Sequence, residues 1–106
     1  MESKYLHILI SAESKEQADQ ILDALVVKKI ISGGLISHGP ARFWWDGEIT
    51  EMEYYNISTF TVAKNKDALI EEVERISVET VPIIAISAMD GNKKFLDWIS
   101  SSVKEA

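Results

Sequence analysis

Residues 43–49 read Phe-Trp-Trp-Asp-Gly-Glu-Ile, and this stretch decides the fold. Asp46-Gly47 suits the left-handed backbone dihedrals of a type I′ turn, which joins two antiparallel strands. Residues 35–45 before the turn and residues 49–62 after it read as extended strands, with aromatic residues next to the turn. The sequence therefore predicts a β-hairpin whose strands, at roughly 11 and 14 residues, exceed the usual length of about 5–6.

The first of these strands is expected to kink at Gly39-Pro40. Because proline has no N–H for a β-ladder, Pro40 is expected at a bulge or on an edge strand. Side chains of the second strand alternate between the two faces of a sheet. One face carries Tyr55, Ile57, Thr59 and Thr61, and the other carries Tyr54, Asn56, Ser58, Phe60 and Val62.

Before the hairpin, the sequence predicts one strand and one helix. Residues 5–10 are short, β-prone and flanked by polar residues, as in a buried strand. Ser14 is expected to begin the helix, and Gln17 lies at the spacing of a capping box. Lys28 and Lys29 are expected to close its last turn, where positive charge suits the helix dipole. The predicted apolar stripe consists of Ala18, Ile21, Leu22, Leu25 and Val26.

After the hairpin, the sequence predicts two more helices with a strand between them. Asn65 is the expected N-cap of the second helix. Residues 81–86 read as a fourth strand, and residues 93–103 as a third, amphipathic helix. The second helix is expected to bury Leu69, Val73 and Ile76 and to expose Glu71, Glu72, Glu74 and Arg75.

The predicted order of elements is β-α-β-β-α-β-α, and its first six members form a split βαβ arrangement. Right-handed crossovers place both main helices on one face of a four-stranded antiparallel sheet. We therefore expect an α+β protein with a ferredoxin-like fold, a C-terminal helix and a long extended hairpin. Residues 1–106 have the size of a single domain.

Composition excludes several classes of function. The formal net charge of −6 disfavours nucleic acids and anionic membrane surfaces as partners. No apolar run reaches the ~18 residues of a transmembrane helix. The chain contains no cysteine, which excludes disulfides and thiolate metal sites. We expect a cytoplasmic protein.

The hairpin predicts a homo-oligomer. Helices cover one face of such a sheet, and the long hairpin overshoots the body of a small domain. Its aromatic residues are poorly suited to solvent and well suited to pairing along the sheet edge of a neighbouring chain. The alternative is that they form cross-strand pairs in an exposed hairpin. The predicted interface residues are Phe43, Trp44, Trp45, Tyr54 and Tyr55.

His7 and His38 are the only histidines and are the candidate metal ligands. Copper and zinc favour imidazole, usually with two or more per site. His7 lies in the predicted first strand, and His38 lies in the kinked stretch before Pro40. The alternative is structural, with His7 partly buried in its strand and His38 at the surface.

No catalytic constellation is found, so we expect a protein that is not an enzyme. A triad needs a nucleophile, a base and an orienting acid in register. The loop at residues 11–14 has no glycines to cradle a phosphate. Gly33-Gly34 precedes a strand, whereas the glycines of a dinucleotide-binding fingerprint open a helix.

Residues 44–49, Trp-Trp-Asp-Gly-Glu-Ile, resemble the hairpin of the CutA divalent-cation-tolerance proteins. Residues 11–14, Val81-Pro82, Gly91-Asn92 and residues 95–99 agree with that family in order and spacing. The resemblance implies a ferredoxin-like fold and a tight homotrimer in which long hairpins pair between subunits. It also implies a role in tolerance to divalent metals, copper above all.

The polar positions of that family are changed. Residues 32–35 read Ser-Gly-Gly-Leu in place of Ala-Cys-Val-Asn, and Phe60-Thr61 stands in place of Lys-Thr. Residues 77–79 read Ser-Val-Glu in place of His-Pro-Tyr, and Ile83 replaces a glutamate. Metal binding by the family's residues is therefore not carried over to this chain.

Two hypotheses of function follow. The first is a non-enzymatic homotrimer of the CutA type that binds copper, another divalent metal or a small ligand in clefts between subunits. The second is a regulatory trimer resembling the PII signalling proteins, which share this topology and act on partner proteins. A PII-type protein needs a long mobile loop between the middle strands, and the tight Asp46-Gly47 turn argues against one.

Overall fold

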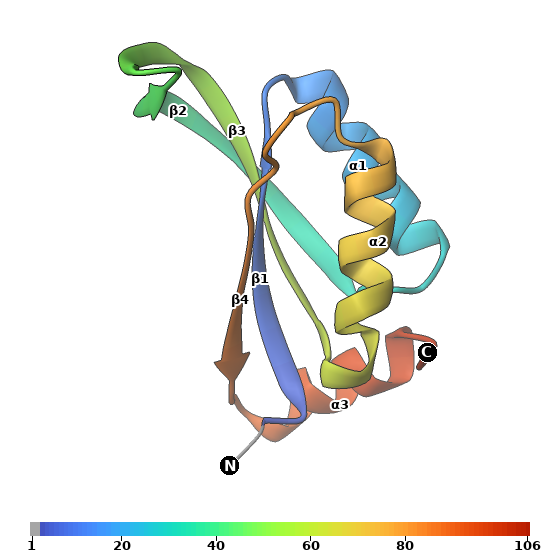
Figure 1. Cartoon of the computed structure of the whole chain (residues 1–106). Helices are drawn as coiled ribbons and strands as arrows, with labels where there is room; N and C mark the ends of the chain where they lie inside the picture. Colours follow the sequence, from blue (N-terminus) through green and yellow to red (C-terminus); the bar gives the residue numbers. More distant parts are fainter. Residues whose placement is uncertain (1–2) are drawn as a thin grey trace.

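The predicted order of elements is confirmed in the computed structural model, which describes residues 3–106. Four strands form a single sheet in the order β2-β3-β1-β4, and all three strand pairs are antiparallel. Helices α1 and α2 pack on one face of the sheet, and α3 crosses its end (Figure 1). This is the ferredoxin-like topology. The elements are β1 (Tyr5–Ala12), α1 (Lys15–Val27), β2 (Gly33–Trp45), β3 (Glu48–Val62), a 3₁₀ turn (Ala63–Asn65), α2 (Lys66–Ile76), β4 (Ile84–Met89) and α3 (Lys93–Ser102).

The hydrophobic core lies between the sheet and the two main helices. It forms because alternate residues of each strand point to the same face. Burying one Leu or Ile side chain stabilises the fold by roughly 1.5–3 kcal/mol. The buried members are Leu6, Ile8, Ile10 and Ala12 of β1, Ile57 of β3, Ala18, Ile21 and Leu25 of α1, Leu69 and Val73 of α2, and Ile31.

Helix α1 begins as predicted, but the reciprocal half of its capping box is wrong. The backbone N–H of Gln17 donates to Ser14 Oγ at 3.1 Å. The Gln17 side chain does not return to Ser14. Its Nε2 donates to Gln20, and its Oε1 accepts the N–H of Val78 at 2.7 Å. The Gln17 side-chain amide accepts this N–H because Val78 lies in the connection between α2 and β4, outside the β-ladder.

The C-terminal end of α1 also differs from the prediction. The helix ends at Val27, so Lys28 is its C-cap and Lys29 lies beyond it with a φ of 58°. Val26, predicted in the buried stripe, is exposed. The lysines therefore do not form the last turn, and Lys28 instead pairs with Glu72 of α2 at 2.6 Å.

Distant segments that approach α2 change two of its expected features. Asn65 is the N-cap residue, as predicted, but its side chain makes no capping hydrogen bond. Its side chain is buried, donates to the carbonyls of Ile30 and Lys104, and accepts the N–H of Ala106. Glu72, predicted on the solvated face, is only 7% exposed.

Strand β4 begins at Ile84, three residues later than predicted. The N–H of Ile83 donates to the side chain of Ser11 at 2.8 Å in place of a backbone carbonyl. The carbonyl of Ile83 still accepts the N–H of Ser11 at 3.0 Å, so only one of its two backbone groups pairs with the backbone of β1, and the strand begins at Ile84. Val81 and Ile83 remain exposed.

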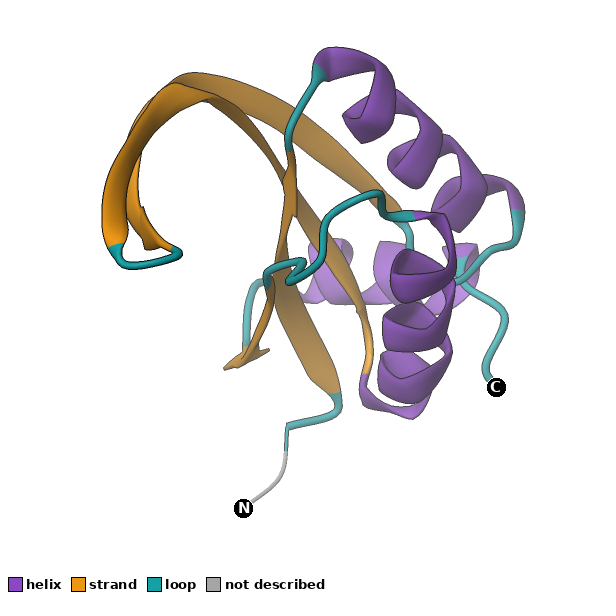
Figure 2. Ribbon diagram, turned by 45° about the horizontal axis from the view of Figure 1, so that its top comes forward, coloured by secondary structure: helices purple, strands orange, loops and turns teal. Residues whose placement is uncertain are grey.

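The β2–β3 hairpin forms as a single arm that projects from the body and curves (Figure 2). Asp46 and Gly47 have φ values of 51° and 78°, which confirms the predicted type I′ turn. The ladder pairs Gly33 with Phe60 at one end and Trp45 with Glu48 at the other, one residue against one. Pro40 lies in an edge strand as predicted, and the alternative prediction of a bulge is wrong.

Candidate functional site

A groove of about 710 Å³ lies between the curved arm and the body. Its walls are the inner face of the arm, the end of β1 and the connection between α2 and β4. Apolar side chains dominate these walls, which is typical of binding sites. They include Phe43, Trp45 and Tyr54 from the arm and Leu9, Val81 and Ile83 from the body.

The structure divides the five predicted interface aromatics. Phe43 and Tyr54 meet edge to face, with ring centroids 5.7 Å apart. Trp45 shares the inner face of the arm with Phe43 because the two lie two residues apart in β2. Trp44 and its ladder partner Ile49 alternate to the other face of the arm, although Trp44 also borders the groove.

Tyr55 also borders the groove, and its ring stacks on His38, at 5.0 Å between centroids.

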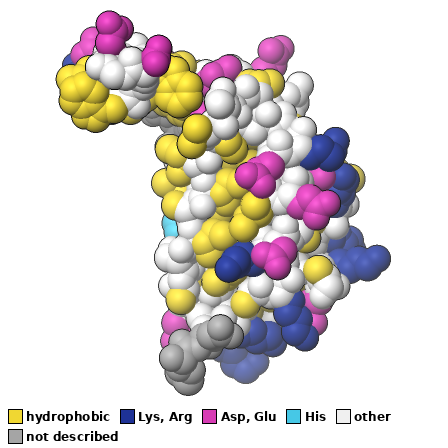
Figure 3. Space-filling view, in the orientation of Figure 1, with side chains coloured by type: hydrophobic (Ala, Val, Ile, Leu, Met, Phe, Trp, Pro, Cys, Tyr) yellow, Lys and Arg dark blue, Asp and Glu magenta, His cyan; other side chains and the backbone are white. Residues whose placement is uncertain are grey.

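The outer face of the arm carries exposed apolar side chains. Trp44 is 73% exposed, and Ile49 is 61% exposed. Hydrophobic side chains gather on the arm and continue below it along the body (Figure 3). Large exposed apolar patches commonly mark interaction sites. Other exposed apolar side chains are Leu9 and Leu35, on the face of the sheet away from α1 and α2, and Val78, Val81 and Ile83, on the connection before β4.

The two candidate metal ligands are not brought together within one chain. His7 lies on β1 opposite Phe60, whereas His38 lies on the arm opposite Tyr55. Their ladder partners lie five positions apart on β3, or about 16 Å along the strand. Among residues 3–106, no group of three or more His, Cys, Asp or Glu side chains is placed to hold a metal ion.

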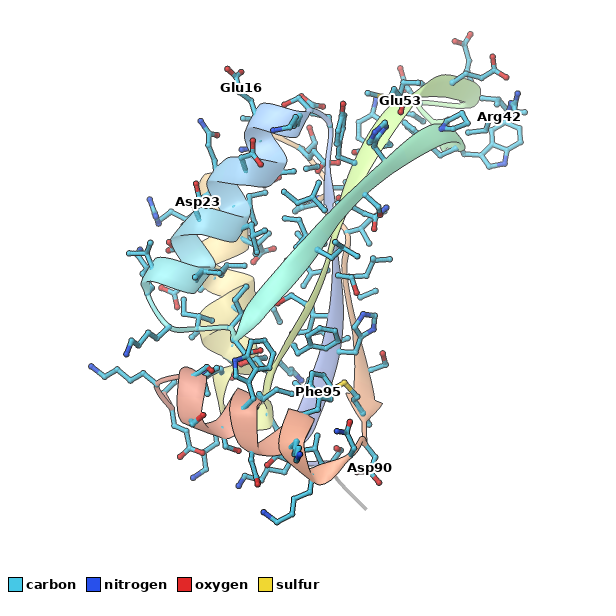
Figure 4. The ribbon with its side chains drawn as sticks, turned by 180° about the vertical axis from the view of Figure 1, so that it is seen from behind. Glu16, Asp23, Arg42, Glu53, Asp90 and Phe95 are labelled. Carbon is cyan, nitrogen blue, oxygen red and sulfur yellow. The ribbon has the colours of Figure 1, made fainter. Side chains whose placement is uncertain are left out.

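Each histidine has one ring nitrogen engaged. His38 Nδ1 lies 2.5 Å from Glu53 Oε1, and both side chains are largely exposed on the arm. Figure 4 shows Glu53 and Arg42 on this projecting arm, away from the body. His7 Nε2 lies 2.6 Å from Ser58 Oγ, and the His7 ring is half-buried against Phe60.

A polar cluster in the groove wall was not found by sequence reasoning. Ser11 Oγ donates to Glu79 Oε2 at 3.0 Å and accepts the N–H of Ile83. Burial raises the pKa of Glu79, and the nearby charge of Glu13 raises it further, against the lowering effect of the Ser11 hydrogen bond. The only signal in the sequence was that Glu79 replaces the tyrosine of the family's His-Pro-Tyr.

Within residues 3–106, none of the helices has the length and apolar character that a membrane span requires.

Taken together, the topology and the arm define a ferredoxin-like α+β protein with an extended β2–β3 hairpin over an apolar groove. The family model described as CutA1 divalent ion tolerance protein matches residues 6–102. The chain belongs to this family.

Named relatives agree with this assignment. A divalent-cation tolerance protein CutA from Archaeoglobus fulgidus is 33% identical over 98 residues, covering 92% of this chain and 96% of the relative. Its counterpart from Thermus thermophilus is 31% identical over 94 residues, covering 87% and 91%. The solved A. fulgidus structure superposes with a TM-score of 0.90 at 30% identity, covering 94% of this chain and 99% of that one.

The names of the relatives differ in cellular location. The A. fulgidus structure is named as a periplasmic protein, and a rice relative that is 25% identical over 101 residues is named as chloroplastic. The cytoplasmic location expected from the sequence therefore stays a prediction.

Proposed function

We propose that this chain is a non-enzymatic homotrimer that acts in tolerance to divalent cations, with copper as the first candidate. One domain spanning residues 1–106 supplies both the arm and the surface that receives it. The observation that carries the proposal is the exposed apolar arm, with Trp44 at 73% and Ile49 at 61% exposure. The names of the relatives, which specify divalent-cation tolerance, support the functional part.

The shape of the contact favours a ring of subunits. An arm that enters the groove of a neighbour joins two different surfaces, which makes the contact heterologous. Heterologous contacts close into rings when the rotation between subunits permits. Three subunits is the number that the family resemblance implies.

Such a contact needs several large apolar side chains. Full burial of one large apolar side chain contributes roughly 1.5–3 kcal/mol. Association costs an estimated 4–15 kcal/mol in lost freedom of motion, so a few side chains are not enough. Each chain would engage its arm in one neighbour and receive the arm of another, so its apolar residues would contribute to two contacts.

The sheet edges provide the backbone part of the contact. β2 and β4 are the two edge strands, so each presents unpaired N–H and C=O groups. Such edges pair readily with another chain. We expect the arm to run along the sheet edge of its neighbour and its aromatic residues to fill the neighbour's groove.

The regulatory alternative is not adopted. A partner-binding trimer of the PII type needs a long loop between the middle strands. Here β2 ends at Trp45 and β3 begins at Glu48, so a two-residue turn joins them.

A double substitution of the arm tests the assembly. Replacing Trp44 and Trp45 with serine should convert a trimer into a monomer in sedimentation velocity. Val27→Ser is the matched control, because Val27 is 79% exposed at the end of α1 and lies away from the arm. The control should remain trimeric. A double variant that keeps its circular-dichroism spectrum and stays trimeric would contradict the proposal.

The cellular role has its own test. Cells that lack this chain should stop growing at a lower copper concentration than cells that carry it. Restoring the wild-type chain should restore growth, whereas the Trp44→Ser/Trp45→Ser variant should not. Equal tolerance with and without the chain would contradict a role in copper tolerance.

A further inference from the structure

The groove between the arm and the body carries two carboxylates that no cation of the described chain neutralises. Glu13, from the connection between β1 and α1, and Glu79, from the connection between α2 and β4, both line it. Neither forms an ion pair with any residue in the range 3–106. Arg42, the positively charged residue of the groove wall, is already paired with Glu51 on the arm. The groove is therefore an apolar space with uncompensated negative charge on one wall.

The carboxylate of Glu79 is held in place and keeps one oxygen free. Ser11 Oγ donates to Glu79 Oε2 at 3.0 Å, and the buried Ser11 is itself fixed by the N–H of Ile83 at 2.8 Å. Within residues 3–106, the other oxygen, Oε1, accepts no hydrogen bond. A carboxylate that is already oriented loses little freedom when it binds a cationic group.

The surroundings of Glu79 disfavour its negative charge. Burial raises the pKa of Glu79 against the lowering effect of the Ser11 hydrogen bond, and the charge of Glu13 raises it further. A positive charge bound beside the two carboxylates would relieve the repulsion between them. Perturbed carboxylates in a cleft are typical of binding sites.

The rest of the groove favours an organic cation over a metal ion. Divalent metals take several strong donors, and among residues 3–106 no group of three or more His, Cys, Asp or Glu side chains is placed to hold one. The groove instead offers the aliphatic side chains of Leu9 and Ile83 and the rings of Phe43, Trp45 and Tyr54. Aromatic faces attract organic cations, and apolar walls suit the carbon skeleton of such a ligand.

The size of the groove fits a small molecule. Its volume of about 710 Å³ lies within the roughly 300–1,000 Å³ of small-molecule sites. Such sites combine apolar walls with a few polar groups that fix the orientation of the ligand. Here Glu79 and Glu13 supply the polar groups, so the charge of the ligand is expected to be positive.

We propose that the groove binds a small organic cation, whose ammonium group lies beside Glu79 and Glu13 and whose apolar body contacts the aromatic and aliphatic walls. The ammonium N–H donates to Glu79 Oε1, the oxygen that Ser11 leaves free. This site goes beyond the proposed function, which uses the apolar walls of the groove for the arm of a neighbour and assigns nothing to its carboxylates. In the proposed homotrimer, the aromatic side chains of that arm pack on the apolar body of the ligand.

Three probes of similar size and different charge test this site. They are phenethylammonium, the neutral phenethyl alcohol and the anionic phenylacetate, each titrated into the full chain at pH 7 and followed by two-dimensional NMR. Phenethylammonium should bind at least about 10-fold more tightly than the alcohol, because hydrogen bonds to charged groups are the stronger ones. Phenylacetate should bind most weakly of the three. Equal affinities for the cation and the alcohol would overturn the proposal.

Glu79→Gln is the decisive variant, because glutamine can still accept the Ser11 hydrogen bond while the charge is removed. We expect it to weaken phenethylammonium binding about 10-fold and to leave the alcohol unchanged. Glu71→Gln is the matched control, since it removes an exposed carboxylate of α2 that does not line the groove, and it should change neither affinity. Glu13→Gln should weaken cation binding by a smaller factor, and it covers the case in which the Glu79 variant fails to fold.

Sedimentation of the same samples separates this site from the proposed homotrimer. A trimer that binds no probe would overturn the site alone, because the arm of the neighbour then occupies the whole groove. A trimer in which Glu79→Gln and Glu71→Gln bind the cation equally well would also overturn it. A folded monomer that binds phenethylammonium with the expected dependence on Glu79 would support the site and overturn the homotrimer.

Discussion

At the scale of single residues, Glu72 connects the two main helices. Its carboxylate accepts two hydrogen bonds from Arg75, at 3.0 and 2.9 Å. It also forms an ion pair with Lys28, the C-cap residue of α1, at 2.6 Å. The Arg75 and Lys28 hydrogen bonds lower the pKa of Glu72 to about 2. Both cationic side chains are at least half exposed, so solvent weakens the contribution of the pairs to stability.

Glu72→Gln should therefore reduce the free energy of unfolding by about 1 kcal/mol at pH 7. The folded-state pKa lies below the unfolded one, so the stabilisation is present above about pH 4.5 and is lost as the pH falls toward 2. Urea unfolding from pH 7 to pH 2 would measure this. The difference between wild type and variant should shrink as the pH falls, and a difference independent of pH would contradict the account.

Residue-scale predictions from sequence succeeded where the partner is local. Ser14 is correctly an N-cap because the N–H that it accepts lies three residues away. The hydrogen-bond partners of the Asn65 and Gln17 side chains were not predicted, because they include Ala106 and Val78, which lie 41 and 61 residues away. Buried side-chain amides bond to whichever orphaned backbone group the fold brings near, and the local pattern does not contain that information.

At the scale of elements, the contact between α1 and β2 depends on a glycine. A side chain at Gly34 would place its Cβ 3.0 Å from Leu22 Cδ1 and 3.1 Å from the carbonyl oxygen of Ser58. The carbonyl belongs to the β-ladder and cannot move away cheaply. The sequence suggested only a break after the helix at Gly33-Gly34, whereas these residues begin β2.

Gly34→Ala should destabilise the fold by roughly 1–3 kcal/mol through overpacking. Gly39→Ala is the matched control, because a Cβ there meets nothing within 4 Å. Thermal unfolding of both variants beside the wild type would compare them. Equal melting temperatures for the two variants would contradict the close approach of α1 to β2.

Element order and type were predictable from sequence because each strand and helix has a clear period and the Asp46-Gly47 turn has a defined geometry. The start of β4 was not predictable from sequence, because it depends on a hydrogen bond from the N–H of Ile83 to the side chain of Ser11, which lies 72 residues earlier.

At the scale of the whole molecule, the groove could not be predicted from sequence. It forms where the curvature of the arm brings Phe43 and Trp45 over the connection that contains Val81 and Ile83. Curvature of a paired ribbon follows from strand twist and packing and leaves no signature in the local pattern of residues. The sequence did predict the exposed aromatic arm itself, from its length and composition.

The central claim is that this arm is completed by sister chains. Sedimentation equilibrium of the wild-type chain, from micromolar to nanomolar concentration, tests that claim most directly. The chain has a mass of 11.9 kDa, and the account predicts a species of three times this mass that persists on dilution. A folded species of 11.9 kDa throughout the series would contradict it.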